Sequence, residues 1–169
     1  MWKVWVFLAP LCPICQDYTF YLNALNEQWE EQYPGEVEMV GWFPNPTVTD
    51  DQIATFAERY GVEWSLAKDT LGWSEAVGAR YTPEAVLVSP EGKLVYRGRV
   101  NDLYYALGKH RSQPKTADLA LAVEQALTGE AVIPAETEAV GCPIERRLPY
   151  DMETAGDAFL VLKDADRMD

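Results

Sequence analysis

The sequence predicts an α/β domain with a central mixed β-sheet and helices on both of its faces, followed by a C-terminal extension. Apolar runs typical of buried strands alternate with amphipathic helical segments through residues 1–130. Two consecutive short strands near the end of this region predict a hairpin. Helical crossovers join parallel strands and a hairpin adds an antiparallel pair, so the two patterns together predict a mixed sheet. Residues 131–169 form a proline-containing, charged tail, partly irregular or docked on the domain.

The first strand is predicted at residues 2–9, where nearly every side chain is apolar, as in a strand buried on both faces. A helix begins after Cys12 and ends at Pro34-Gly35, and a second apolar strand follows at residues 37–43. The helix carries one apolar stripe, with charged residues outside it. The stripe consists of Ile14, Tyr18, Leu22, Leu25 and Trp29.

The second helix has a recognisable beginning and end. Thr49 followed by Gln52 is a capping box, and Gly61 is the expected C-cap. A short strand is predicted at residues 64–67 and a brief helix at residues 71–77. The buried face of the second helix consists of Ile53, Phe56, Ala57 and Tyr60.

The hairpin is predicted at residues 85–89 and 93–99, around a Pro-Glu-Gly turn. Residues 101–113 are expected to be irregular or partly helical. The last helix begins at Thr116 and ends before a glycine, and its apolar side consists of Leu119, Val123 and Leu127. Residues 159–162 form a short apolar run in the tail that either docks on the domain or stays mobile.

Length and composition limit the classes of function. A chain of 169 residues is long enough for one domain with a full core. The net charge of −13 argues against a nucleic-acid partner, because phosphates would be repelled. No apolar run approaches the roughly 18 residues of a membrane span. Three cysteines are too few for a disulfide scaffold.

The sequence Cys12-Pro13-Ile14-Cys15 lies where the first strand runs into the first helix. A thiol at a helix N-terminus faces unpaired backbone N–H groups, so its pKa falls and its thiolate becomes a nucleophile. Cys12 occupies that position, and Cys15 lies one turn further in, where it can attack a mixed disulfide on Cys12. Pro13 suits the first helical turn. The pattern favours thiol redox chemistry.

Two other interpretations of the cysteine pair stay open at this point. The cysteines can be small core residues, or they can be half of a zinc site. A structural zinc site usually needs a second pair of ligands, and the sequence offers only Cys142 and a single histidine, His110.

Over residues 2–130 the chain resembles the thioredoxin fold. More closely it resembles the redoxins, which include bacterial thiol-disulfide oxidoreductases of the TlpA and ResA kind and the related AhpC/TSA peroxiredoxins. The resemblance rests on the Cys-Pro-Ile-Cys motif and on three further segments. These are Ala67-Lys68-Asp69, Tyr81-Thr82-Pro83-Glu84, and residues 89–98 (Ser-Pro-Glu-Gly-Lys-Leu-Val-Tyr-Arg-Gly).

The resemblance implies a substrate site around the cysteines. It implies that Pro83 is preceded by a cis peptide bond and faces the cysteines, which leaves the Thr82 backbone free to pair with a substrate strand. Thr82, Pro83 and Pro13 are therefore the expected substrate-binding residues. Expected partners are protein or small-molecule thiols and disulfides, with a thiol redox partner. No cofactor and no metal are expected.

Two departures from the family pattern affect the chemistry. Thioredoxins carry a buried aspartate six residues before the first cysteine, and that position is Val6 here. Another group must then accept the proton of Cys15, and Glu84 or a water molecule is the candidate. The threonine and proline that peroxiredoxins place before the peroxidatic cysteine are replaced by Ala9 and Trp5. Thiol exchange is therefore favoured over peroxidase chemistry.

The predicted function is thiol-disulfide exchange at Cys12 and Cys15. One alternative is a copper- or zinc-handling module, with Cys142 or His110 as a further ligand, and a third interpretation is a thiol peroxidase. The resemblance to exported bacterial redoxins implies a periplasmic or otherwise exported protein, with a leader that this sequence does not include. A cytoplasmic location is the alternative.

Cys142 is the third candidate thiol. It lies in residues 139–144, past the last predicted helix, and repeats the Cys-Pro-Ile of the first motif. It is either an incidental free thiol or a third redox thiol, because a lone cysteine carries no spacing information. In the second case the tail folds back over the helix start and brings Cys142 to Cys12.

Overall fold

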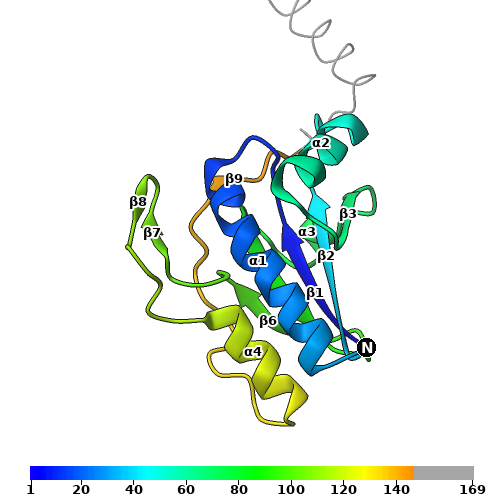
Figure 1. Cartoon of the computed structure of the whole chain (residues 1–169), viewed down its shortest axis with the longest axis vertical. Helices are drawn as coiled ribbons and strands as arrows, with labels where there is room; N and C mark the ends of the chain where they lie inside the picture. Colours follow the sequence, from blue (N-terminus) through cyan, green and yellow to red (C-terminus); the bar gives the residue numbers. More distant parts are fainter. Residues whose placement is uncertain (147–169) are drawn as a thin grey trace, which may run out of the picture.

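A five-stranded mixed sheet forms the centre of the molecule in the computed structural model, which describes residues 1–146 (Figure 1). The strand order is β3-β2-β1-β5-β6. Strands β1, β2 and β3 are parallel, whereas β5 is antiparallel to β1 and β6 is antiparallel to β5. The strands are β1 (Trp2–Phe7), β2 (Val37–Phe43), β3 (Ser65–Lys68), β5 (Glu84–Val88) and β6 (Leu94–Gly98). The predicted mixed sheet is confirmed.

Helices cover both faces of this sheet. Helices α1, α2 and α4 contribute apolar side chains to the larger core cluster on one face. The short helix α3 packs on the other face, where a smaller cluster includes Trp73 and Val77. The helices are α1 (Pro13–Gln32), α2 (Asp50–Tyr60), α3 (Trp73–Ala76) and α4 (Asp118–Leu127).

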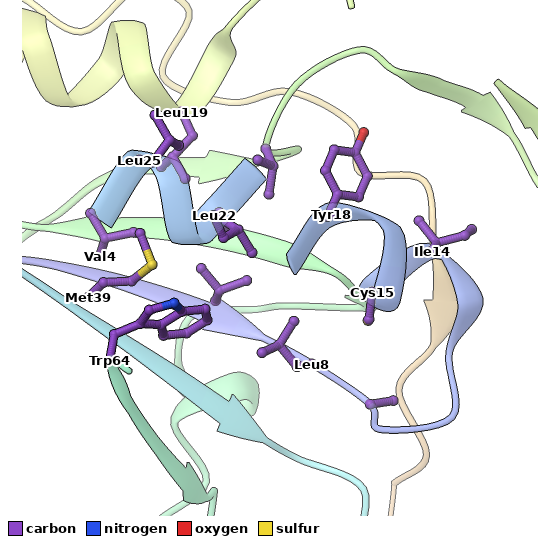
Figure 2. Packing of buried hydrophobic residues seen from close by; sticks show 14 of the residues in the cluster. Val4, Leu8, Ile14, Cys15, Tyr18, Leu22, Leu25, Met39, Trp64 and Leu119 are labelled. Atoms are coloured by element: carbon purple, nitrogen blue, oxygen red, sulfur yellow. The ribbon is translucent and has the colours of Figure 1, made fainter. Parts of the chain in front are cut away.

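Strand β1 is apolar apart from Lys3, because both of its faces are covered from Val4 onward. Val4 and Val6 belong to the larger cluster, while Trp5 and Phe7 belong to the smaller one. Figure 2 shows the larger cluster, in which Leu22 of α1 points toward the sheet that carries Val4. The strand therefore anchors the loop that leads to Cys12 on a fully buried element.

The local signals around the second helix are confirmed. The Thr49 hydroxyl accepts a hydrogen bond from the backbone N–H of Gln52, and the Gln52 side chain accepts one from the Thr49 N–H. Gly61 ends the helix in the left-handed conformation with φ of 63°, which glycine adopts without a steric penalty.

One stretch differs from the sequence-based expectation. Residues 101–113 contain a small hairpin of β7 (Tyr104–Ala106) and β8 (Lys109–His110), where irregular or helical structure was expected. Strands this short carry no readable alternation. Tertiary contacts hold the hairpin instead, including a hydrogen bond from the Tyr104 hydroxyl to Asp17 of α1.

The first part of the C-terminal tail also forms a strand. Strand β9 (Cys142–Pro143) pairs antiparallel with β4 (Tyr81–Thr82), beside the start of α1 (Figure 1). The apolar run at residues 159–162 lies outside the described residues, and the domain boundary at residue 130 stays a prediction. Within residues 1–146, no helix has the length and apolarity needed to span a membrane.

We predict that Leu22→Ala lowers the free energy of unfolding by about 2–5 kcal/mol, because Leu22 is 0% exposed at the centre of the α1–sheet contact. Urea unfolding followed by tryptophan fluorescence measures this change. Leu71→Ala is the matched control: Leu71 is 76% exposed, so its change is expected to stay within about 0.5 kcal/mol. Equal losses in the two variants would contradict the packing described here.

Candidate active site

Cys12 lies at the point where β1 has ended and α1 begins. It is the N-cap residue of α1, with extended backbone angles, and Pro13 occupies the first helical turn. The backbone N–H groups of Ile14 and Cys15 point toward the Cys12 sulfur and lower the pKa of its thiol. The local sequence thus produces the thiol position expected from the motif, at the positive end of a 20-residue helix.

Cys15 lies one turn further along α1 and is completely buried against the sheet (Figure 2). Burial raises the pKa of its thiol well above the ordinary value, and the negative charge that forms on Cys12 raises it further. The Thr82 hydroxyl opposes this shift with a hydrogen bond. Cys15 is therefore the protonated member of the pair.

The pKa of Cys12 falls from the ordinary 9.0 to about 5. The largest cause is a hydrogen bond from the Cys15 thiol, and burial of Cys12 opposes it. A hydrogen bond from the thiol of Cys142 lowers the pKa further. A thiolate at Cys12 is thus surrounded by donors that favour its charged form.

Cys142 is brought directly to the first cysteine pair. Its sulfur lies 3.0 Å from the sulfur of Cys12, although the two residues are 130 positions apart in the chain. Burial raises the pKa of Cys142 to about 11, and the adjacent Cys12 adds to this increase. Three thiols therefore meet at the start of α1, with the negative charge held on Cys12.

Thr82 and Pro83 lie beside the same thiols. The peptide bond between them is cis, as the family resemblance implies, and the Thr82 carbonyl oxygen lies 3.4 Å from the Cys12 sulfur. The Thr82 backbone is not open to a substrate strand here, because Thr82 already pairs with Cys142. Pro13 is exposed at the helix start.

Two residues considered from the sequence lie elsewhere. Glu84 pairs with Phe7 in the sheet, so it shares the face opposite to that of Val6 and Cys15. There its carboxylate accepts a hydrogen bond from the Arg80 N–H. The hypothesis that Glu84 takes the proton of Cys15 is therefore wrong, because strand alternation turns the carboxylate away from the thiol.

His110 is exposed on the β7–β8 hairpin, where its ring packs on Tyr104 and its Nδ1 is hydrogen-bonded to the Arg111 carbonyl. Over residues 1–146, no group of three or more His, Cys, Asp or Glu side chains is arranged to hold a metal ion. The described residues thus offer no support for the copper- or zinc-handling alternative.

Sequence reasoning missed the residues of the tail that hold Cys142 in place. Gly141 contacts the Thr82 backbone, Ile144 is buried in the smaller core cluster, and Arg146 is hydrogen-bonded to Ser74 and Ala79. The repeated Cys-Pro-Ile was a signal for Cys142 itself. No periodicity marks the segment, because its strand is only two residues long.

Comparison with known proteins identifies the fold. A candidate thioredoxin from Neisseria meningitidis matches with a TM-score of 0.55 and 13% identity, over 75% of each chain. The chain has a thioredoxin-like fold.

Two proteins of unassigned activity match more of this fold. A hypothetical protein from Sinorhizobium meliloti matches with a TM-score of 0.71 and 26% identity, over 85% of this chain and 78% of its own. An uncharacterized conserved protein from Geobacillus kaustophilus matches with a TM-score of 0.73 and 22% identity, over 89% and 79%. No family model and no curated protein matches the sequence.

We predict that the ultraviolet absorbance of thiolate rises in the reduced protein as the pH passes upward through about 5. The pKa of Cys12 is lowered, so the thiolate persists above that pH and is lost when the pH falls below it. A pH titration of the reduced protein measures the midpoint.

Two variants assign this transition to the site. Cys12→Ser is expected to abolish the step near pH 5, while Cys142→Ala is expected to move it to higher pH, because the thiol that donates a hydrogen bond to the thiolate is removed. A first thiol ionisation near the ordinary pKa of 9.0 in the wild-type protein would contradict the proposed environment of Cys12.

Proposed function

We propose that this chain is a thiol-disulfide oxidoreductase in which Cys12 is the nucleophile and Cys15 the resolving thiol. The observation that carries the proposal is the contrast between the two thiols. Cys12 is stabilised as a thiolate at the start of α1, while Cys15 stays protonated one turn further in. This contrast is what a two-step exchange needs, because only one thiol should attack first.

In the first step, the Cys12 thiolate attacks one sulfur of a substrate disulfide. The substrate S–S bond breaks, one substrate thiolate leaves and takes up a proton, and Cys12 carries a mixed disulfide. In the second step, Cys15 loses its proton and attacks the Cys12 sulfur, and the second substrate thiolate leaves. The products are a Cys12–Cys15 disulfide and a substrate reduced by two electrons, and the reverse sequence oxidises a dithiol.

The first step prepares the second. The hydrogen bond to Cys12 and the negative charge on Cys12 both raise the pKa of Cys15. Both effects end when the Cys12 sulfur enters a mixed disulfide, so the proton of Cys15 is held less strongly at the moment when Cys15 must attack. This removes part of the need for a side-chain base such as the aspartate that Val6 replaces.

The substrate class we propose is a protein or small-molecule disulfide or dithiol, with a separate thiol redox partner. Membership of the redoxin branch of the TlpA and ResA kind is part of the same proposal. It is supported by the Cys-Pro-Ile-Cys motif and by the position of Thr82 beside Cys12. The peroxidase interpretation gains no support from the site, and the exported location stays a prediction.

Trapping of a mixed disulfide tests the assignment of roles, and it is done in a Cys142→Ser background because Cys142 otherwise competes as a resolving thiol. After prolonged incubation with oxidised glutathione, Cys15→Ser/Cys142→Ser is expected to accumulate the adduct on Cys12. Cys12→Ser/Cys142→Ser is expected to accumulate about tenfold less, since Cys15 is 0% exposed and protonated.

Mass spectrometry of the intact and digested proteins locates the adduct. Leu71→Ala in the same two backgrounds serves as a control for nonspecific effects, since its side chain is exposed. Equal adduct on Cys12 and Cys15 would refute the assignment, and no adduct on either would refute the proposed chemistry.

A further inference from the structure

Residues 135–146 run along the domain as a fixed segment, here named the strap. Its first part is bound to β6, where the Arg97 N–H donates to the Ala135 carbonyl at 3.0 Å and the Thr137 N–H donates to the Arg97 carbonyl at 3.1 Å. The Thr137 hydroxyl accepts from the Arg99 N–H at 3.0 Å. The strap is therefore tied to the sheet before it reaches the thiols.

The strap then pairs with β4 next to the cysteines. Cys142 lies opposite Thr82 and Pro143 lies opposite Tyr81 in an antiparallel ladder, and the Ile144 N–H donates to the Arg80 carbonyl at 2.9 Å. The exposed backbone edge beside a cis proline is where the family resemblance expects a substrate strand. In this chain, its own residues fill that edge.

Gly141 makes this close approach possible. A Cβ atom at this position would lie 2.2 Å from the Thr82 carbonyl oxygen and 2.7 Å from the carbonyl carbon, both of which are backbone atoms. Neither atom can move aside as the end of a flexible side chain can. Any residue larger than glycine at position 141 therefore pushes the strap away from β4.

Two contacts secure the strap beyond Cys142. The Ile144 side chain is buried in the smaller core cluster, with Trp5 and Phe7 of β1. The Arg146 guanidinium donates to the Ser74 hydroxyl at 2.8 Å and to the Ala79 carbonyl. Because the strap is anchored on both sides of Cys142, the 3.0 Å sulfur–sulfur distance is set by the fold and not by a loose tail.

The position of the strap also affects how exposed each of the three cysteines is to solvent. Cys12 is only 4% exposed and Cys15 is fully buried, whereas Cys142 is partly exposed. The edge of β4 that pairs with the strap is not available to a substrate strand while the strap is bound. Cys142 is thus the most exposed of the three cysteine residues, and we expect an external thiol to reach its sulfur first.

We propose that the strap is a built-in substrate strand and that Cys142 is the thiol through which external dithiols exchange electrons with Cys12. This inference rests on the proposed function of the Cys12–Cys15 pair. It adds Cys142 as a third catalytic thiol, and it names a class of partner. These partners are thiol compounds or proteins that react at the sulfur of Cys142 and do not pair with β4 as an added strand.

The relay runs in three balanced steps, starting from the protein with a Cys12–Cys15 disulfide. Deprotonated Cys142 attacks the Cys12 sulfur, the Cys12–Cys15 bond breaks, and Cys15 leaves as a thiolate and takes up the proton. An external thiolate then attacks the Cys142 sulfur, and Cys12 leaves as a thiolate. Finally the second thiol of the external dithiol attacks the sulfur of the same dithiol that is bound to Cys142, and Cys142 leaves as a thiolate. The dithiol is thereby oxidised to a disulfide, and the protein is reduced by two electrons.

The second step suits the chemistry of the site. Attack on Cys142 expels Cys12, and thiols of low pKa leave faster in disulfide exchange. The pKa of Cys12 is the lowered one of the pair and that of Cys142 is raised. In a Cys12–Cys142 disulfide, Cys142 is thus the sulfur that is attacked, and Cys12 is the better leaving group.

The test is the rate at which dithiothreitol reduces the oxidised protein, measured by acid quenching and counting of free thiols. Cys142→Ser keeps the strap but removes the relay, so reduction is expected to slow by about tenfold or more. Gly141→Ala/Cys142→Ser releases the strap and uncovers Cys12, so its rate is expected to return to within about threefold of wild type. Ile144→Ala/Cys142→Ser releases the strap by a second route and should behave alike.

Ala131→Ser, which adds one atom at an exposed position outside the strap, is the control and should match wild type. Reduction of Cys142→Ser at the wild-type rate would overturn the relay, as would a free Cys142 in peptide maps of oxidised Cys15→Ser protein. Failure of the proposed function itself would give a different result. In that case no disulfide would form or exchange at Cys12 and Cys15, even in Gly141→Ala/Cys142→Ser and Ile144→Ala/Cys142→Ser, in which the strap is released.

Discussion

The site depends on one constraint, the need to stabilise negative charge on a sulfur atom that is almost buried. Removing an ion from water is costly unless hydrogen bonds replace the lost solvation. Around Cys12 those bonds come from the backbone at the start of α1, from Cys15 and from Cys142. These donors come from two segments, the first turn of α1 and strand β9, so the ionisation of Cys12 depends on the docking of β9 beside α1.

The same constraint explains why the site is built on β1. This strand is buried on both faces, and it ends a few residues before Cys12. Helix α1 is packed on the larger core by Leu22 and Leu25. The helix start and the thiol are thereby held against a rigid sheet, as a preorganised donor arrangement requires.

The strap combines structural and chemical roles in one short segment. It covers the edge of β4, which would otherwise expose unpaired backbone groups. It also contributes Ile144 to the core and a thiol to Cys12. The strap thus closes one backbone edge of β4 and fixes the Cys142 sulfur beside that of Cys12.

Much of the fold was predictable because its signals are local. The second strand at Val37–Phe43, the capping box at Thr49 and the left-handed Gly61 follow from patterns within a few residues of sequence. The hairpin at residues 101–113 was missed because strands of two or three residues have no readable alternation, and long-range contacts hold it.

The sequence by itself determined the chemistry of the helix start: two thiols one turn apart, with a proline in the first turn. Only the tertiary structure decided how that chemistry is surrounded. It turned Glu84 to the opposite face of the sheet, and it placed Cys142 beside Cys12 across 130 residues. The physical reason is that a helix N-terminus is formed by residues that are neighbours in the sequence. Strand pairing and sulfur contacts instead join segments that are far apart in the sequence, and their separation in sequence does not predict their distance in space.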